Sequence, residues 1–187
     1  MRRWALPVGG LLLLALLFVA LWFRHRATRY DHLIAQAAAR HGLDFYLVKA
    51  LIYEESWFRP DVRGNSGEVG LMQVSLAAAR DFSVRKGFPE ISEARLLEPD
   101  LNLEVGCWYL KQSLDRYLDS PAPLVFALSR YNAGEIKSDG WWRRAKERTL
   151  PPGMPAEEYC LSRIDYPRTR DYARRILMRY RSRNFFF

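Results

Sequence analysis

One glutamate of this chain lies where a charged group is costly. Glu55 shares one face of a predicted helix with apolar residues only, which precede it by seven, four and three positions: Val48, Leu51 and Ile52. A carboxylate at the end of an apolar stripe is costly to ionise unless it is paired, so burial raises its pKa and keeps a proton available near neutral pH. Such a group can act as a general acid that protonates a leaving glycosidic oxygen.

Two other features of this helix bear on that interpretation. Glu54 points about 100° away around the helix and should be solvated. The alternative for Glu55 is a structural role at the helix end, with the carboxylate bonded to a nearby amide or to Arg59.

Local signals delimit the helices of the first half of the chain. Residues 31–40 form a first short helix that His41-Gly42 stops. Asp44 can cap the helix that carries Glu55, which runs to about residue 57 and ends before Pro60. A turn-rich stretch at 61–67 follows, and residues 71–82 are predicted to be helical again.

The second half of the chain is also predicted to be helical. Pro99 opens a helix in which apolar residues recur at helical spacing, and Pro123 begins another that ends at Asn132-Ala133-Gly134. The stretch 135–155 is predicted to be irregular, and a last helix to span 168–180. No alternating apolar pattern is long enough to demand a sheet, so the domain is predicted to be nearly all α.

Four blocks of residues, in this order, resemble the catalytic domain of the soluble lytic transglycosylase family. They are Glu55-Ser56-Trp57-Phe58-Arg59-Pro60 with Gly70-Leu71-Met72-Gln73, Asn102-Leu103-Glu104-Val105-Gly106 with Tyr109-Leu110, Ala127-Leu128-Ser129-Arg130-Tyr131-Asn132-Ala133-Gly134, and Thr169-Arg170-Asp171-Tyr172. The resemblance runs from Ile34 to Arg179. It implies a lysozyme-like helical fold, as in goose-type lysozyme, with a long cleft for a sugar polymer.

The resemblance also implies roles for individual residues. Glu55 would be the catalytic residue. Gln73 and Met72 would line the cleft, Tyr131 would help to orient the carboxyl group of Glu55, and Ser56 would hold the same helix end. The substrate-binding residues expected on this basis are Ser56, Met72, Gln73, Tyr131 and Asn132. Tyr131 and Met72 could instead be plain core residues, and Gln73 a residue of a helix surface.

Some positions depart from the family pattern. Gly64 stands where a serine is usual, and Glu68 replaces a common alanine in the turn before Gly70. Ser75 and Leu76 replace the apolar residue and the proline that often follow the glutamine. These differences leave the catalytic group in place, but they change local substrate contacts, and Glu68 adds a second carboxylate near the cleft.

The chemistry that the resemblance implies needs one carboxyl group. Glu55 would protonate the oxygen between N-acetylmuramic acid and N-acetylglucosamine, and would then take the proton of the muramyl 6-hydroxyl as that hydroxyl attacks the anomeric carbon. The product is a 1,6-anhydro sugar, formed without water. We expect no metal and no cofactor, because the histidines are early and scattered in the sequence: His25, His32 and His41.

Three alternatives remain open at this stage. One is a hydrolytic muramidase on the same fold, which would need a water activated by an acid such as Glu68 or Asp61. Another is a non-catalytic scaffold that grips peptidoglycan within a membrane complex. The third is nucleic-acid binding through Trp141-Trp142-Arg143-Arg144. An export-type amino terminus disfavours a nucleic-acid partner, and a binding module does not need the acid.

The first 29 residues are predicted to form a membrane anchor, and 30–187 the catalytic domain. An apolar run at 4–23, flanked by Arg2-Arg3 and by Arg24, is long enough to cross a bilayer as a helix. A cleavable secretory signal is the competing interpretation, but Leu21-Trp22-Phe23 stand where small residues should mark the cleavage site. The expected location is the bacterial inner membrane, single-pass, with the catalytic domain in the periplasm, where peptidoglycan lies.

The net charge of +8 does not by itself indicate a nucleic-acid partner. The first 29 residues hold five arginines and no acid, and the remainder has 24 basic against 21 acidic residues. Eight arginines lie between 163 and 187, where they form a solvated helix face or attract anionic lipid or an acidic polymer. Cys107 and Cys160 could pair or could be two buried thiols.

Overall fold

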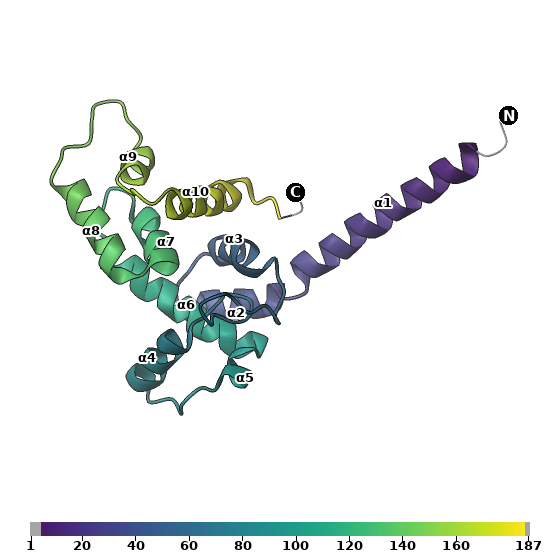
Figure 1. The fold of residues 1–187 in the computed structure, drawn as a ribbon, viewed down its shortest axis with the longest axis horizontal. Helices are drawn as coiled ribbons and strands as arrows, with labels where there is room; N and C mark the ends of the chain where they lie inside the picture. Colours follow the sequence, from purple (N-terminus) through teal and green to yellow (C-terminus); the bar gives the residue numbers. More distant parts are fainter. Residues whose placement is uncertain (1–4, 186–187) are drawn as a thin grey trace.

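The computed structural model describes residues 5–185, which fold into α-helices joined by loops (Figure 1). Within this part of the chain no strand forms, and isolated β-bridges join Val69 to Arg63 and to Val74. The prediction of an all-α fold is confirmed.

Helix α1, Ala5–Thr28, extends away from the other helices (Figure 1). Its 24 residues span about 36 Å, more than the roughly 30 Å of a bilayer's hydrocarbon core. The large side chains between Leu11 and Trp22 are exposed, so the rest of the fold does not bury them. By length and composition this helix could cross a membrane. The charged residues predicted to precede it, Arg2 and Arg3, lie outside the described residues.

Helices α2, Asp31–Arg40, and α3, Phe45–Ser56, have the predicted boundaries. The Asp44 carboxylate caps α3, since it accepts hydrogen bonds from the backbone N–H groups of Tyr46 and Leu47. This cap fixes the first turn of α3 and, with it, the direction in which Glu55 points twelve residues further on from residue 44's neighbour region at the helix end.

The segment 71–75 is not helical, contrary to the sequence prediction. Gly70 and Gln73 have positive φ angles of 81° and 46°, which no helix accommodates, and the backbone of Val74 bonds back to Val69. The helix α4 begins only at Leu76 and ends at Lys86, because the Ser75 side chain caps its first turn.

The central helices follow. The short α5, Glu93–Leu96, was not predicted, whereas α6, Pro99–Arg116, and α7, Pro123–Ala133, begin at the predicted prolines. Helix α6 packs against α2, α4, α5 and α7 and thus forms the centre of the domain.

The segment after Gly134 is helical in its first half, so the prediction of an irregular stretch is wrong there. Helix α8, Glu135–Lys146, buries Ser138, Trp141 and Ala145 at helical spacing, and Trp141 Nε1 donates to Asp165 Oδ1 at 2.5 Å. Tertiary burial of this face outweighs the mixed local pattern. Helices α9, Ala156–Ser162, and α10, Pro167–Ser182, complete the fold, and α10 packs on both α3 and α7.

The two cysteines are buried, free thiols in different parts of the core. Cys107 Sγ lies 4.0 Å from Met72 Sδ, and Cys160 Sγ lies 3.8 Å from Ser120 Oγ. Of the two interpretations that the sequence left open, the structure matches buried thiols.

Candidate active site

Glu55 lies in the last turn of α3, where the chain changes direction sharply. Trp57 and Phe58 adopt left-handed backbone conformations, with φ of 54° and 59°, so α3 stops at Ser56. The Glu55 side chain is partly buried, and the hydroxyl of Tyr172 in α10 donates a hydrogen bond to Glu55 Oε1. Because α10 packs along α3, this contact joins residues that are 117 positions apart in the sequence.

Glu54 points away from Glu55, as predicted, but it is paired rather than freely solvated. Its carboxylate accepts a hydrogen bond from Arg175 Nε at 2.7 Å, and its side chain is only 17% exposed. The two adjacent acids therefore have different environments, and only Glu55 lacks a cationic partner among the described contacts.

Burial raises the pKa of Glu55 to about 7. The hydrogen bond from Tyr172 opposes this rise, and the negative charges of Glu54 and Glu68 add to it. Burial and the neighbouring Glu55 also raise the pKa of Tyr172, which keeps its hydroxyl protonated as a donor. A carboxyl group with such a pKa is present in both its acid and its base form near neutral pH, as a group that first gives and later takes a proton requires.

Gln73 faces the same site from the turn before α4. Its Nε2 donates to the carbonyl oxygens of Val62 at 3.1 Å and Gly70 at 3.0 Å, which holds the side chain in place. Its positive φ belongs to this turn, so local backbone geometry and side-chain hydrogen bonds together set the position of the amide.

Asn102 in α6 holds this turn from beneath. The buried side chain accepts from the backbone N–H of Met72 at 2.8 Å and donates to the carbonyl oxygens of Val69 and Leu96, both at 2.8 Å. A Cβ on Gly70 would lie 2.3 Å from Asn102 Nδ2, so glycine is needed for this close approach. Asn102 belongs to a quoted family block, but the sequence analysis gave it no role.

Two residues predicted to bind substrate lie beneath the cleft rather than in it. Met72 is fully buried, and its sulfur packs against the Cα position of Gly106. Ser56 is 2% exposed and donates from Oγ to the carbonyl oxygen of Leu71 at 2.8 Å. We therefore interpret both as residues that support the site, as the sequence analysis also considered for Met72 and expected for Ser56.

Tyr131 and Tyr172 have exchanged the part that the sequence analysis gave to Tyr131. The Tyr131 hydroxyl donates to the carbonyl oxygen of Met72 at 2.8 Å instead of contacting the Glu55 carboxyl group. Tyr172 makes that contact. The only sequence signal for Tyr172 was its place in the last family block, on the buried face of α10 with Ala173 and Ile176.

A polar cavity of about 220 Å³ opens beside Glu55, lined also by Glu68, Gln73, Tyr131 and Asn132. Asn132 Oδ1 accepts a hydrogen bond from Thr169 Oγ1 at 2.8 Å, so α10 also fixes this side chain. The structure thus brings together Glu55 and three of the five predicted substrate-binding residues.

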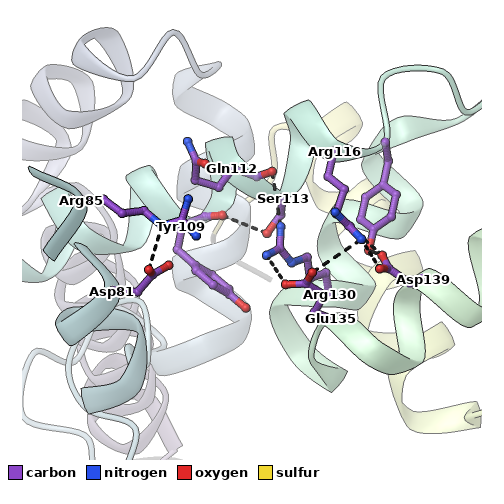
Figure 2. Close-up of polar contacts among 10 residues, drawn as sticks. Asp81, Arg85, Tyr109, Gln112, Ser113, Arg116, Arg130, Glu135 and Asp139 are labelled. Atoms are coloured by element: carbon purple, nitrogen blue, oxygen red, sulfur yellow. Dashed lines mark hydrogen bonds and ion pairs between the residues drawn. The ribbon is translucent and has the colours of Figure 1, made fainter. Parts of the chain in front are cut away.

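A second cavity of about 230 Å³ shares Glu68, Gln73, Tyr131 and Asn132 with the first and extends it along α6 and α7. Tyr109 and Arg130 border it. The Arg130 guanidinium lies 5.5 Å from the Tyr109 ring and donates to Glu135 at 2.7 Å (Figure 2). Together the two cavities form an elongated polar cleft with Glu55 at one end.

The other ligands considered from the sequence find less support in the geometry. Trp141 is 2% exposed and Trp142 packs edge-on against Tyr117, so neither presents a free face on which a base could stack. Within residues 5–185, no three His, Cys, Asp or Glu side chains converge in a way that could hold a metal ion.

Comparisons with known proteins agree with this arrangement. The membrane-bound lytic murein transglycosylase F of Desulfosudis oleivorans is 32% identical over 174 residues, which cover 83% of this chain and 36% of that protein. The membrane-bound lytic murein transglycosylase C of Histophilus somni is 38% identical over 115 residues, covering 58% of this chain and 32% of that protein. The chain therefore spans about a third of the length of these curated relatives.

Solved structures share the fold. The lytic transglycosylase Slt of Pseudomonas aeruginosa, solved as an inactive mutant, superimposes with a TM-score of 0.70 at 26% identity, covering 82% of this chain and 23% of that one. A 70-kDa soluble lytic transglycosylase in complex with bulgecin A gives a TM-score of 0.71 at 22% identity, over 83% of this chain and 24% of that one.

The fold and the site together define a lysozyme-like helical domain built around one partly buried glutamate. The family model described as the transglycosylase SLT domain matches residues 32–150, so the chain belongs to this family.

Proposed function

We propose that this chain is a peptidoglycan lytic transglycosylase with Glu55 as its catalytic residue. It cleaves the β-1,4 bond between N-acetylmuramic acid and N-acetylglucosamine and leaves 1,6-anhydromuramyl ends. The observation that carries the proposal is the Glu55 carboxyl group, whose pKa burial raises to about 7 and which opens into a polar cleft. The names of the relatives, which are lytic murein transglycosylases, support the same reaction.

Glu55 acts first as an acid and then as a base. Its proton passes to the glycosidic oxygen as the bond to the anomeric carbon breaks, and the carboxylate then takes the proton of the muramyl 6-hydroxyl as this oxygen attacks the same carbon. Tyr172 holds the carboxyl group during both steps and stabilises its ionised form through the hydrogen bond to Oε1. Atoms balance without water, metal or cofactor.

Gln73 and Asn132 serve as the substrate-binding residues of the cleft. Both side chains are held by hydrogen bonds to the protein and still line the cavity, which suits amide contacts with acetamido and hydroxyl groups. Tyr131 lines the cavity with its ring while its hydroxyl holds Met72.

The chain is anchored in the bacterial inner membrane through residues 1–29, with the domain at 30–187 in the periplasm. The apolar, exposed α1 supports a single membrane span, and the relatives are named membrane-bound. An apolar cavity of about 540 Å³ between α1 and α3, bordered by Phe23, Tyr53 and Trp57, is consistent with a domain that lies against the membrane surface. Peptidoglycan is present on that side, so the active site faces its substrate.

Digestion of isolated peptidoglycan by the full chain in detergent tests this function. Mass spectrometry should find anhydromuramyl ends with the native chain and with Glu54→Gln, and none above background with Glu55→Gln. The matched pair differs by one position and removes one carboxylate each, so loss of charge alone is controlled. Equal activity of the Glu55→Gln variant would contradict the proposal. Binding to sacculi without any cleavage would favour the scaffold instead.

A further inference from the structure

A second carboxylate lies in the cavity beside Glu55. Glu68 lines both this cavity and the one that adjoins it. Asp61, the other acid that the sequence suggested as a water-activating group, is exposed and lines neither. Of the two candidates, only Glu68 is placed where it could act on a substrate bound at Glu55.

The Glu68 carboxylate has a defined position over the turn that carries it. The backbone N–H of Ser66 donates to Glu68 Oε2 at 3.2 Å, and the backbone N–H of Gly64 donates to the Glu68 carbonyl oxygen at 2.7 Å. A Cβ on residue 64 would lie 2.6 Å from Glu68 Oε2. Gly64 therefore leaves free the space beside the carboxylate, so the two departures from the family pattern, Gly64 and Glu68, are structurally linked.

A second acceptor points to the same place. Both hydrogens of Gln73 Nε2 are used in bonds to Val62 and Gly70, so Gln73 presents Oε1 as its remaining polar atom. The same Cβ position on residue 64 lies 2.8 Å from Gln73 Oε1. Two acceptor oxygens thus converge in front of Gly64, and neither can donate to the other. A water molecule, with two O–H donors, fits between such acceptors.

We propose that this chain also hydrolyses the glycosidic bond, with a water that Glu68 activates and Gln73 orients. This inference rests on the proposed function, since it uses the same substrate and the same acid. Glu55 protonates the leaving oxygen, which keeps the electron pair of the broken bond to the anomeric carbon. The water oxygen forms a new bond to that carbon while Glu68 takes one of the water protons.

Both carboxyl groups return to their starting states by proton exchange with solvent, so one turnover consumes one water. The muramyl 6-hydroxyl and the water compete for one carbon, and the chain therefore yields two kinds of ends. Glu68 sets the ratio of reducing to anhydro ends.

The test measures this ratio for the full chain. Peptidoglycan is digested, treated with borohydride, which reduces hemiacetal ends but not anhydro ends, and analysed by mass spectrometry, with Glu55→Gln digests giving the background of both ends. The native chain should produce new reducing ends beside anhydro ends. Glu68→Gln should lower the ratio of reducing to anhydro ends by roughly 100-fold, as expected for loss of a general base, while anhydro ends still form. Asp61→Asn should leave the ratio unchanged.

The outcomes separate this inference from the proposed function. If the native chain makes anhydro ends only, or if Glu68→Gln leaves the ratio unchanged, the inference is wrong and the transglycosylase stands. If new reducing ends carry one ¹⁸O when the digestion is run in H₂¹⁸O and depend on Glu68, the inference is supported. If neither kind of end forms with the native chain, the proposed function fails, and the inference with it.

Discussion

At the scale of single residues, the site depends on how Glu55 is protonated. Burial raises its pKa, and the only hydrogen bond to its carboxylate comes from a tyrosine rather than from a cation. Glu54, one position earlier, pairs with Arg175 and cannot take the same part. The difference between the two acids is therefore one of environment, since their chemistry is the same.

The rate of anhydro-end formation should fall above pH 7. Glu55 must be protonated to act as an acid, and with its pKa at about 7 the protonated fraction drops by about tenfold per pH unit above that value. Below pH 7 the protonated form dominates, so this group causes no loss there. A pH–rate profile of the full chain on a soluble glycan oligomer measures the effect, and a rate that stays flat to pH 9 would contradict it.

Replacement of Tyr172 by phenylalanine should shift the same limb of the profile to higher pH. The hydrogen bond from Tyr172 stabilises the ionised carboxyl group and lowers the pKa of Glu55, so its removal raises that pKa. The rate at pH 6 should also fall, because the carboxyl group loses its positioning contact. Tyr180→Phe, eight residues further along α10, is the control and should leave the profile in place. An unshifted limb in Tyr172→Phe would show that the contact does not tune Glu55.

At the scale of the elements, α6 and the turn at 62–74 position the cleft together. Asn102 makes three hydrogen bonds to the turn and its surroundings, and Gly106 allows Met72 to lie directly on α6. Met72 in turn offers its carbonyl oxygen to Tyr131. A change beneath the turn is thus passed to the residues that line the cavity.

Gly106→Ala tests this arrangement. The new Cβ would lie 2.5 Å from Met72 Sδ and 2.8 Å from Met72 Cβ in a fully buried region, so we expect a loss of about 1–3 kcal/mol in the free energy of unfolding. Gly140→Ala in α8 is the matched control, because nothing lies within 4 Å of its Cβ, and it should stabilise by about 0.5–1 kcal/mol. Chemical denaturation of both variants gives the two values, and equal stabilities would contradict the packing argument.

At the scale of the whole molecule, an apolar helix carries the domain. The exposed leucines of α1 have no partner surface among the described helices that would bury them, which a lipid environment would supply. The short connection between α1 and α2 keeps the domain next to the end of α1 (Figure 1).

Leu14→Arg should weaken membrane association. An arginine near the centre of a membrane span costs about 3 kcal/mol in insertion, so more of the chain should leave the membrane fraction on sedimentation. Leu118→Arg, at a leucine that is 64% exposed on the domain, should leave the distribution unchanged. The intact mass of the native chain checks the alternative of a cleaved signal. A chain shortened near residue 23 would contradict the anchor.

The sequence by itself determined the features that depend on neighbouring residues. Asp44, Pro99, Pro123 and Gly134 mark helix boundaries that the structure confirms, because caps and backbone restrictions act within one turn. The apolar face before Glu55 indicated a buried carboxyl group for the same local reason.

The tertiary structure alone decided which residues meet. The choice of Tyr172 rather than Tyr131 as the partner of Glu55 depends on how α10 packs on α3. The burial of Met72, the helical state of α8 and the presence of Glu68 in the cavity depend likewise on contacts between distant segments. Local propensity carries no information about such contacts, because their energy arises only when the helices have packed.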